Sequence, residues 1–271
     1  MGIFDGVLLA SDFDGTLTGS NGIIPQNNID AIKYFISEGG KFSVSTGRTK
    51  LGFHNYNNEF INAPVILGNG GMAYDYSLGK IAFVNAIEKS NLEILSKILL
   101  QFPCIGMEIY TVNDITYVIN PSELNFNHFK GLKIDSFNIA SEVSSEMFPA
   151  VKIMLSAGNQ TFEVQDYLRK IELNTMKFIP CSGSFVEILA DSAGKGLSLL
   201  RLADYLCIKH ENAYAVGDAS NDVDMLLSAK SGFVPSSGDE YAKSVATEIV
   251  CSSDSGAVSD VIFRLRNLYL K

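Results

Sequence analysis

The sequence contains no tryptophan, three histidines and four cysteines among its 271 residues. Basic residues are also scarce, because 21 lysines and arginines stand against 30 aspartates and glutamates, a formal net charge of −9. A chain this acidic offers no extended cationic surface, so we expect neither nucleic acid nor an anionic membrane as a partner. A bound anion would have to be held locally, by a few placed donors or by a metal ion.

The cysteines lie far apart, and no two of them have the spacing of metal ligands; they are Cys104, Cys181, Cys207 and Cys251. Their apolar surroundings favour buried free thiols in a reducing compartment over disulfides. No apolar run approaches the ~18 residues of a membrane span, and no basic segment precedes an apolar one near residue 1. These absences predict a cytoplasmic protein.

Apolar residues, in contrast, are abundant. They make up 46% of the chain and charged residues 19%, which is typical of a packed globular protein and excludes a disordered one. At about 150 residues per domain, the length predicts roughly two domains.

Short apolar runs alternate with helical patterns at both ends of the chain. Four runs are predicted to be strands: Val7–Ala10, Phe42–Ser45, Pro64–Gly68 and Ala213–Val216. The first is continuously apolar, which is typical of a strand buried on both faces. A helical face opens at Pro25, between the first two runs, and closes at the glycine pair that follows. Strands separated by helices predict a parallel, doubly wound α/β sheet.

The middle of the chain has a different pattern. A capping box at Ser90–Glu93 predicts the start of a helix. Strand-like runs at Ile105–Val112 and Thr116–Ile119 are separated by the turn pair Asn113-Asp114. This α+β pattern predicts an inserted cap domain over 85–188, which interrupts a Rossmann-like core over 1–84 and 189–271.

Polar residues follow three of the predicted core strands, and in chain order they are Asp12 and Asp14, Thr46 and Gly47, and Asp218 and Asp222. The carboxyl ends of parallel strands meet at one edge of a sheet, where ligands bind. Four carboxylates gathered there repel one another unless a cation lies among them, and Mg²⁺ suits both carboxylates and substrate phosphate. With Lys195 and N–H groups at glycine turns as phosphate donors, this edge predicts phosphoryl transfer.

Each element alone also has a plainer interpretation. Asp14-Gly15 is a common turn pair, and Lys195 between two glycines suits a loop. Asp218 and Asp222 suit solvated acids at a helix start. The three histidines have no partner pattern, so we expect them on the surface or in satisfied core positions. The order of the motifs, each at the end of a strand or the start of a helix, favours the chemical interpretation.

These segments together resemble the four motifs of the haloacid dehalogenase (HAD) superfamily. The motifs are Asp12-Phe13-Asp14-Gly15-Thr16, Thr46-Gly47-Arg48, Lys195-Gly196 and Gly217-Asp218-Ala219-Ser220-Asn221-Asp222. The long insert after the second motif is similar to the C2-type cap of the Cof-type sugar-phosphatase branch. One segment departs from that branch, which often has Val-Ala-Met-x-Asn-Ala where this chain has Phe233–Gly238 and no asparagine.

The resemblance implies a Mg²⁺-dependent phosphomonoesterase that acts on a small phosphorylated metabolite, a sugar phosphate, through an aspartyl-phosphate. Asp12 would be the nucleophile, and Asp14 would protonate the leaving alcohol and then activate water. The metal would be held by the carboxylates of Asp12 and Asp218 and by the carbonyl of Asp14. Asp222 would order the water shell of the metal.

The resemblance also implies a set of groups that hold the phosphoryl oxygens: Thr46, Gly47, Lys195 and Asn221. Arg48 and Asn69 are candidate supporting residues, although the first equally suits a surface ion pair and the second a tight turn. The insert would select the leaving alcohol, because the core groups can recognise only the phosphoryl group that all candidate substrates share.

Two other functions use similar residues. A phosphomutase or phosphotransferase would share the aspartyl-phosphate, but Asp14 favours hydrolysis because it can activate water. A phospho-acceptor signalling domain also has an acidic pocket with a threonine and a lysine, but it needs neither a large cap nor an acid for a leaving group. A P-loop is excluded, because Ala193–Gly196 lacks the serine or threonine and the upstream glycine.

Overall fold

The computed structural model describes residues 2–180 and 183–270 and divides into two compact units. Unit 1 comprises Met1–Gly47, Asn55–Phe83 and Gly194–Lys271. Unit 2 comprises Arg48–His54 and Val84–Ala193. The sequence did not single out Arg48–His54 as part of the second unit. The predicted division into a core and a cap domain stays a prediction.

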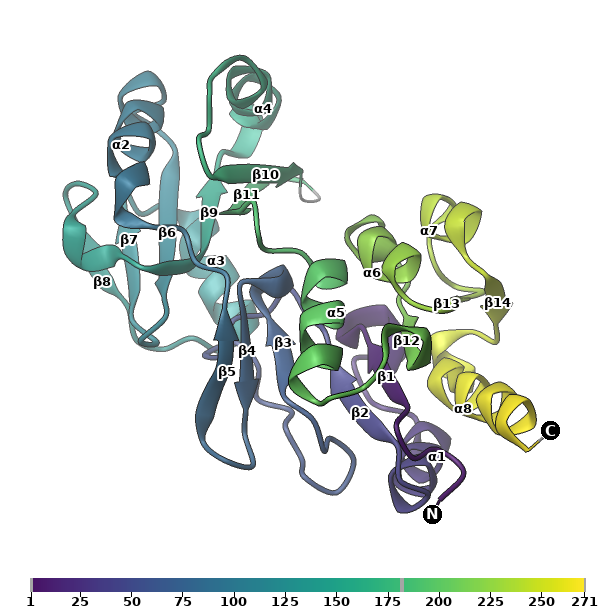
Figure 1. Cartoon of the computed structure of the whole chain (residues 1–271). Helices are drawn as coiled ribbons and strands as arrows, with labels where there is room; N and C mark the ends of the chain where they lie inside the picture. Colours follow the sequence, from purple (N-terminus) through teal and green to yellow (C-terminus); the bar gives the residue numbers. More distant parts are fainter. Residues whose placement is uncertain (1, 181–182, 271) are drawn as a thin grey trace. The chain divides into compact units, whose positions relative to one another are not determined.

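A five-stranded parallel sheet forms the centre of unit 1 (Figure 1). Its order is β14–β13–β12–β1–β2, and its strands are β1 (Leu8–Ser11), β2 (Lys41–Val44), β12 (Ala213–Val216), β13 (Gly232–Pro235) and β14 (Glu248–Val250). All four neighbouring pairs are parallel. Because β1 is buried along its whole length, apolar residues occupy both of its faces. The predicted α/β class with a parallel sheet is confirmed.

Helices cover both faces of this sheet, and they are α1 (Gln26–Ser37), α5 (Lys195–Tyr205), α6 (Val223–Ser228), α7 (Glu240–Val245) and α8 (Ala257–Tyr269). Leu8 of β1 packs in one apolar cluster with Leu199 of α5 and Met225 of α6. On the other face, the Tyr214 hydroxyl of β12 lies 3.0 Å from the Tyr269 hydroxyl of α8. The sheet is therefore doubly wound, as the sequence predicts.

A small antiparallel sheet adjoins the parallel one. Its strands are β3 (Val65–Leu67), β4 (Met72–Asp75) and β5 (Lys80–Val84), of which the sequence indicated only the first. A parallel bridge between Ser45 and Ile66 joins β3 to the end of β2. The bridge holds Ser45, the residue after β2, beside β3.

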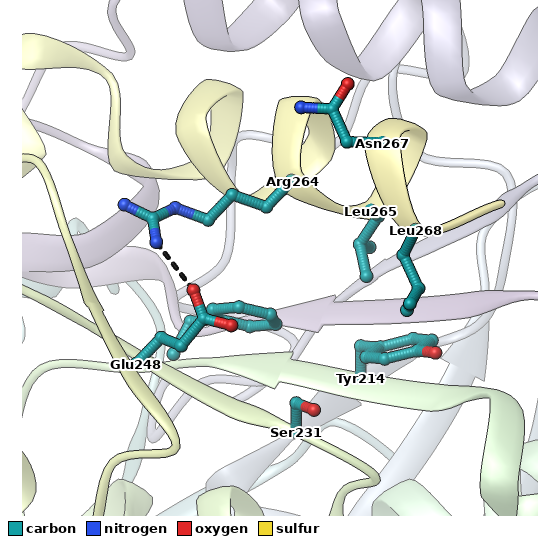
Figure 2. Close-up of a pocket in the computed structure, with 8 residues that line it drawn as sticks. Tyr214, Ser231, Glu248, Arg264, Leu265, Asn267 and Leu268 are labelled. Carbon is teal, nitrogen blue, oxygen red and sulfur yellow. Dashed lines mark hydrogen bonds and ion pairs between the residues drawn. The ribbon is translucent and has the colours of Figure 1, made fainter. Parts of the chain in front are cut away.

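A pocket of about 220 Å³ lies between α8 and the β12–β14 part of the sheet (Figure 2). Ser231, just before β13, and Glu248, the first residue of β14, line it from the sheet. Arg264 of α8 lines it from the helix and pairs with Glu248 at 2.5 Å. The pocket thus lies at the amino ends of the strands, opposite the edge at which the motifs gather.

A six-stranded sheet forms the centre of unit 2, in the order β10–β11–β9–β6–β7–β8. Its strands are β6 (Gly106–Thr111), β7 (Thr116–Ile119), β8 (Asn138–Ala140), β9 (Ala150–Ser156), β10 (Met176–Pro180) and β11 (Phe185–Ala190). The predicted hairpin is present as β6 and β7, and Asp114 in its turn has a φ of 62°. Only β7 and β8 run parallel among the described neighbouring strands.

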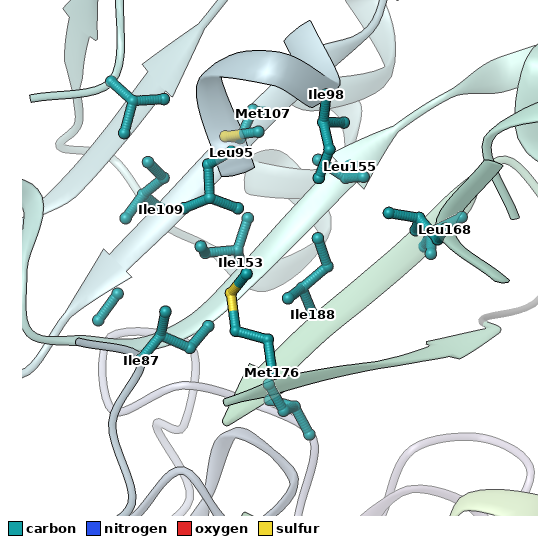
Figure 3. Close-up of a cluster of buried hydrophobic side chains, with 14 of the residues drawn as sticks. Ile87, Leu95, Ile98, Met107, Ile109, Ile153, Leu155, Leu168, Met176 and Ile188 are labelled. Atoms are coloured by element: carbon teal, nitrogen blue, oxygen red, sulfur yellow. The ribbon is translucent and has the colours of Figure 1, made fainter. Parts of the chain in front are cut away.

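One face of this sheet is apolar and is covered by α2 (Leu92–Gln101) and α4 (Thr161–Lys170). Figure 3 shows the cluster, in which Leu95 and Ile98 of α2 meet Met107 and Ile109 of β6. The predicted capping box at Ser90–Glu93 is wrong. A 3₁₀ turn over Lys89–Asn91 precedes α2, and the Asn91 amide donates to the Glu88 carbonyl (3.2 Å) and to the Thr175 hydroxyl (3.1 Å) instead of capping the helix.

The opposite face of the sheet carries charges beside α3 (Glu123–Leu132). Glu108 is fully buried and accepts hydrogen bonds from the Tyr110 hydroxyl (2.6 Å) and the Asn125 amide (2.9 Å). His128 Nδ1 lies 2.8 Å from the same carboxylate. Lys152 of β9 pairs with Glu187 of β11 at 2.9 Å. Each buried acid of this face therefore has a cationic or hydrogen-bonding partner.

The three cysteines that the structure describes are free but not buried as predicted. Cys104 and Cys207 are exposed and Cys251 is half-buried, while Cys181 lies outside the described residues. Cys207 has a φ of 56° in the turn after α5, and such turns lie on the surface. In the part of the chain that the structure describes, no helix is both long and apolar enough to span a membrane.

Candidate active site

The site begins where two neighbouring strands of unit 1 end. Ser11 of β1 pairs in register with Val216 of β12, so Asp12 and Gly217 leave the sheet side by side. The Asp12 N–H donates to the Val216 carbonyl oxygen at 2.8 Å, which fixes the backbone of the aspartate. Asp12 is 6% exposed and Asp218 is half-buried. The parallel register thus brings the first and fourth motifs together at one edge, as predicted.

The tight turn after Asp12 explains the residues that follow it. Gly15 has a φ of 87°, a conformation that favours glycine. A Cβ at Gly15 would lie 2.8 Å from Asp218 Oδ2, so the close approach of the two segments also requires glycine. The Thr16 hydroxyl donates to Asp218 Oδ1 at 2.5 Å. Asp14 lies between these contacts on the exposed side of the turn.

Lys195 is the first residue of α5 and is 1% exposed, which excludes the interpretation as a loop lysine. Its Nζ lies 2.5 Å from Asp12 Oδ1 and 2.5 Å from Asp222 Oδ1. The start of α5 is fixed from outside the helix, because the Gly196 N–H donates to Asp224 Oδ2 at 3.0 Å. An ammonium group has three donors, so the pairs with two carboxylates leave one for a phosphoryl oxygen.

Asp222 orients the fourth motif. Its Oδ2 accepts hydrogen bonds from the N–H groups of Asp218 and Ala219, each at 3.0 Å. Its Oδ1 receives Lys195. Since both oxygens are engaged, the contacts suit an orienting role for Asp222 and leave Asp218 Oδ2 to face the turn at Gly15.

This cluster contains three aspartates, Asp12, Asp218 and Asp222, and one lysine, Lys195. Burial raises the pKa of Asp12 well above its ordinary value against the opposing attraction of Lys195, and Asp222 and Asp218 raise it further. Burial also raises the pKa of Asp218, against the hydrogen bond from Thr16. Burial alone would lower the pKa of Lys195, but Asp12 and Asp222 raise it above its ordinary value. Burial among further acids thus disfavours ionisation of Asp12 and Asp218, and a further cation would favour it.

The donor set fits a hard divalent cation. One carboxylate oxygen from each of Asp12, Asp218 and Asp222 can be chosen so that all three lie within 4.8 Å of one another. All three donors are carboxylate oxygens. Mg²⁺ prefers such oxygen ligands, whereas zinc is commonly bound by nitrogen and sulfur atoms. A dication would offset the excess negative charge that raises the pKa of Asp12 and Asp218.

A second group of predicted residues forms around the end of β2. The Thr46 N–H donates to the Ile66 carbonyl (2.9 Å), and the Asn69 N–H donates to the Thr46 carbonyl (3.0 Å). Asn69 has a φ of 50°, and its side-chain Oδ1 accepts from the Asn221 amide at 3.3 Å. A Cβ at Gly47 would lie 3.1 Å from the Asn69 amide group. Hydrogen bonds and close contacts therefore connect the second motif with Asn221 of the fourth.

Arg48 belongs to unit 2, where its Nη1 donates to the Gly52 carbonyl oxygen at 3.3 Å. Its supporting role stays a prediction. The divergent segment Phe233–Gly238 lies at the end of β13 and turns back against the fourth motif. A Cβ at Gly238 would lie 3.0 Å from the Asp218 carbonyl oxygen, and the Asp239 N–H donates to that oxygen at 2.8 Å. The segment thus supports the backbone of Asp218 without an asparagine.

Sequence reasoning missed two residues that hold this site together. Thr16 was noted as part of the first motif, but its hydrogen bond to Asp218 follows only from the register of β1 and β12. Asp224 was not singled out, although its position two residues after Asp222 at the start of α6 was a usable signal. Both residues orient groups that the motifs supply.

Comparisons with known proteins show the family of the chain. The model of one family, described as haloacid dehalogenase-like hydrolase, matches residues 9–262. The 5-amino-6-(5-phospho-D-ribitylamino)uracil phosphatase YwtE of Bacillus subtilis is 25% identical over 95% of this chain and 97% of its own length. The phosphatase YwpJ of the same organism is 25% identical over 95% of this chain and 99% of its own length.

Solved structures share the fold. The sugar phosphatase BT4131, of HAD subclass IIB, superposes with a TM-score of 0.82 at 19% sequence identity. The alignment covers 96% of this chain and 99% of that one. At this level of identity the match establishes the architecture, which includes both units of this chain.

Proposed function

The chain belongs to the haloacid dehalogenase-like hydrolases and is a phosphatase of that family, and we propose that it hydrolyses a sugar phosphate with Mg²⁺ through an aspartyl-phosphate. One observation carries the proposal. A buried aspartate at the end of β1 is held by Lys195 inside a cluster of three acids. A cluster used only for stability would be balanced, because an excess of buried like charges is costly.

In the first half of the reaction, the Asp12 carboxylate attacks the phosphorus atom and the bond from phosphorus to the alcohol oxygen breaks. Lys195 Nζ, Asp222 and the backbone bond to Val216 hold Asp12 in place for attack. Asp14 donates a proton to the departing alcohol oxygen. The exposed position of Asp14 on the turn suits a group that reaches the leaving alcohol.

In the second half, the Asp14 carboxylate takes a proton from water while the water oxygen attacks the phosphorus of the aspartyl-phosphate. The bond from phosphorus to the Asp12 oxygen breaks, which releases phosphate and regenerates both carboxyl groups. Dividing the displacement in this way replaces one difficult step with two easier ones. Thr46, Gly47, Lys195 and Asn221 are proposed to hold the phosphoryl oxygens through their N–H, O–H and ammonium groups.

Asp12, Asp218 and the backbone of Asp14 would hold Mg²⁺, with Asp222 orienting the Asp218 segment. Bound there, the ion supplies charge stabilisation to the phosphoryl oxygens. The residues of the chain align the nucleophile and move the proton.

The leaving alcohol is proposed to be a neutral sugar or sugar alcohol. The relative YwtE is named for a phosphate ester of a ribityl chain, and the structural neighbour BT4131 is named a sugar phosphatase. The proposed partner is therefore a small-molecule phosphate ester, and a cytoplasmic location stays a prediction.

The test is a screen of phosphorylated metabolites with Mg²⁺ and without any acceptor molecule, in which released phosphate is measured. The panel should contain hexose and pentose phosphates and 5-amino-6-(5-phospho-D-ribitylamino)uracil. We expect release from at least one member and none from the matched Asp12→Asn variant. Phosphate transfer that requires an added acceptor would instead support a phosphotransferase, and equal release by both proteins would contradict the aspartyl-phosphate.

A further inference from the structure

The turn that follows β3 in unit 1 places an asparagine in the left-handed region of backbone conformation. This turn spans Gly68–Gly70, and Asn69 at its centre has a φ of 50° and a ψ of 38°. Asn69 is also buried, at 6% exposure. Glycine adopts such a backbone more easily than any other residue, although asparagine tolerates it better than most. The contacts of the Asn69 side chain therefore offset the cost of an asparagine at this position.

The backbone of Asn69 holds the peptide group that carries one proposed phosphate donor. The Asn69 N–H donates to the Thr46 carbonyl oxygen at 3.0 Å. That oxygen belongs to the peptide between Thr46 and Gly47, which is trans. In a trans peptide the C=O and the N–H point in opposite directions within one plane. The bond to the carbonyl therefore also sets the direction of the Gly47 N–H, which points away from Asn69.

The side chain of Asn69 holds a second proposed donor. The Asn221 amide donates to Asn69 Oδ1 at 3.3 Å. An amide NH₂ group has two hydrogens, so this bond directs one of them to Asn69 and the other is available to a phosphoryl oxygen. The Asn69 amide also lies against Gly47, because a Cβ at Gly47 would be 3.1 Å from both its nitrogen and its oxygen. Asn69 thus contacts a donor of the second motif and a donor of the fourth.

We propose that Asn69 is a positioning residue, which orients the Gly47 N–H through its own N–H and the Asn221 amide through its side chain, so that both donate to one phosphoryl group. This inference rests on the proposed function, since it concerns the phosphate donors of the same site. All the contacts that carry it lie within unit 1, although the residues come from three separate segments of the chain.

The first experiment compares Asn69→Gly with Asn120→Gly. Asn120 is a matched control, because its φ is 48° and its amide donates to the Pro103 carbonyl oxygen at 3.3 Å. For each variant we would measure the inhibition constant of inorganic phosphate, kcat and KM for acetyl phosphate, and Tm. We expect Asn69→Gly to weaken phosphate binding roughly threefold to tenfold, as for one lost hydrogen bond. Asn120→Gly should change it less than about twofold.

The division of the effect between KM and kcat adds a readout that a purely structural role would not move. Both donors hold the phosphoryl group in the bound substrate as well as during transfer, so KM should rise by about the same factor as the inhibition constant, and kcat should change less. Equal effects of Asn69→Gly and Asn120→Gly on phosphate binding, or no effect of Asn69→Gly, would overturn the positioning role.

A second substitution at the same position separates the backbone from the side chain. Asn69→Ala and Asn69→Gly both remove the amide, but alanine disfavours the left-handed backbone that glycine accepts. We expect Asn69→Ala to weaken phosphate binding by a further factor of about two or more, because the N–H that holds the Thr46 carbonyl is then displaced. Equal inhibition constants for the two variants would contradict the backbone part of the proposal.

A double-mutant cycle with Asn221→Ala tests the side-chain part. Since the Asn69 amide is proposed to act through Asn221, Asn69→Gly should weaken phosphate binding less than about twofold in the Asn221→Ala background. The difference between glycine and alanine at position 69 should persist in that background, because it acts through Gly47. Additive effects of Asn69→Gly and Asn221→Ala would show that the two side chains act independently, which contradicts this part.

A variant of Gly47 keeps the test decisive if the variants of Asn69 do not fold. Gly47→Ala retains the N–H and adds a methyl group that must displace the Asn69 amide. We expect it to weaken phosphate binding in the wild-type background and to have less than about twofold effect beside Asn221→Ala. The same loss in both backgrounds would mean that the methyl group acts without Asn69 and Asn221, and the side-chain part would be wrong.

Failure of the proposed function can be told apart from failure of this inference. If the wild-type chain releases no phosphate from any ester, phosphate binding by the same variants can still be followed through line broadening of inorganic phosphate in ³¹P NMR. Weaker binding by Asn69→Gly and not by Asn120→Gly then supports the inference without catalysis. Phosphate release by the wild type, with the same inhibition constant in Asn69→Gly, would support the function and overturn the inference.

Discussion

Unit 1 and unit 2 each bury charged side chains, one at the edge of a sheet and the other on a sheet face. In unit 1, one ammonium, Lys195, contacts two carboxylates, and a third, Asp218, has an oxygen within 4.8 Å of an oxygen of each. In unit 2, Lys152 pairs with Glu187, and Glu108 receives a hydroxyl, an amide and a histidine. The first group has an excess of acid, whereas the second is matched partner by partner.

The comparison shows which buried charges point to a ligand. Hydrogen bonds from a hydroxyl and an amide offset the cost of burying the Glu108 carboxylate. Burial raises the pKa of Asp12 and Asp218, whose neighbours include further acids. A buried charged side chain therefore does not by itself indicate a ligand-binding site. A cluster with more buried acids than cationic partners does.

The sharpest way to break the comparison is to neutralise one buried carboxylate in each unit. Asp12→Asn should lower phosphate release at least about a thousandfold, because an amide cannot act as the nucleophile. It should not unfold the protein, since it is nearly isosteric and relieves repulsion among the acids. Its matched control is Glu108→Gln, which should keep phosphate release from acetyl phosphate and lower Tm instead. Loss of activity in both variants, with both folded, would contradict the distinction between the units.

Removal of the metal should affect unit 1 alone. EDTA should abolish phosphate release and Mg²⁺ should restore it, whereas Ca²⁺, with its larger and looser shell, should bind without efficient turnover. Mg²⁺ at a hundred times its Kd should stabilise the protein by about 2.7 kcal/mol. This gain should disappear in Asp218→Asn and remain in Glu108→Gln, as measured by Tm. Full activity of the metal-free protein would remove the metal from the proposal.

Within unit 1, Asp14 differs from the buried Asp12, because Asp14 is exposed and its proposed role is proton transfer. Asp14→Asn should slow the hydrolysis of sugar phosphates by about 10²–10⁴-fold. Hydrolysis of p-nitrophenyl phosphate should slow less, since nitrophenolate leaves without a proton. Release of alcohol in the first turnover should be measured, so that a slow second step, which also needs Asp14, does not hide the difference. Equal losses of first-turnover rate on both substrates would argue against the acid role.

A closer comparison removes one hydroxyl donor from one carboxylate in each unit. Thr16→Val deletes the donor to Asp218, and Tyr110→Phe deletes a donor to Glu108. Thr16→Val should weaken Mg²⁺ binding about 10- to 100-fold, as is usual for groups that orient metal ligands. Tyr110→Phe should cost about 1.5–3 kcal/mol of stability and leave Mg²⁺ binding unchanged. Titration of each variant with Mg²⁺, followed by Tm and activity, separates the two outcomes.

The sequence predicted strands β1, β2, β3 and β12 of unit 1, because they are short apolar runs, and polar motifs follow β1, β2 and β12 directly. It did not predict β4, β5, β13 and β14. Parallel strands place such ends at one edge whatever the intervening loops are, and so Asp12, Asp218 and Lys195 could be expected together. The roles assigned to these residues stay predictions. The hairpin of β6 and β7 was equally clear from its turn pair.

The remaining features depend on contacts between distant parts of the chain. Nothing near Leu51 indicates that its partners are Tyr110 and Phe129, so the assignment of Arg48–His54 to unit 2 could not be predicted. For the same reason, a chain in which a linker replaces 85–188 would expose the face of Leu51 that this cluster covers. An experiment on the selectivity of the insert therefore needs a polar residue at Leu51 as well.

The smallest expected effect concerns pH, and it measures the excess of acid directly. In metal-free protein, burial holds the pKa of Asp12 above its ordinary value of 3.8, so the folded state retains a proton that the unfolded state has lost. Stability therefore falls as pH rises from about 4 through the raised pKa, and it stays low above that pKa. Asparagine at position 12 does not titrate, so the Tm of Asp12→Asn minus that of the wild type should grow over this window. The growth should be a few degrees, at about 2–4 °C per kcal/mol. Saturating Mg²⁺ should shrink or reverse this difference in Tm, because the ionised Asp12 carboxylate of the wild type would then bind the metal ion. A difference that does not change with pH in EDTA would mean that Asp12 ionises without cost, and the contrast between the two units would then lose its electrostatic basis.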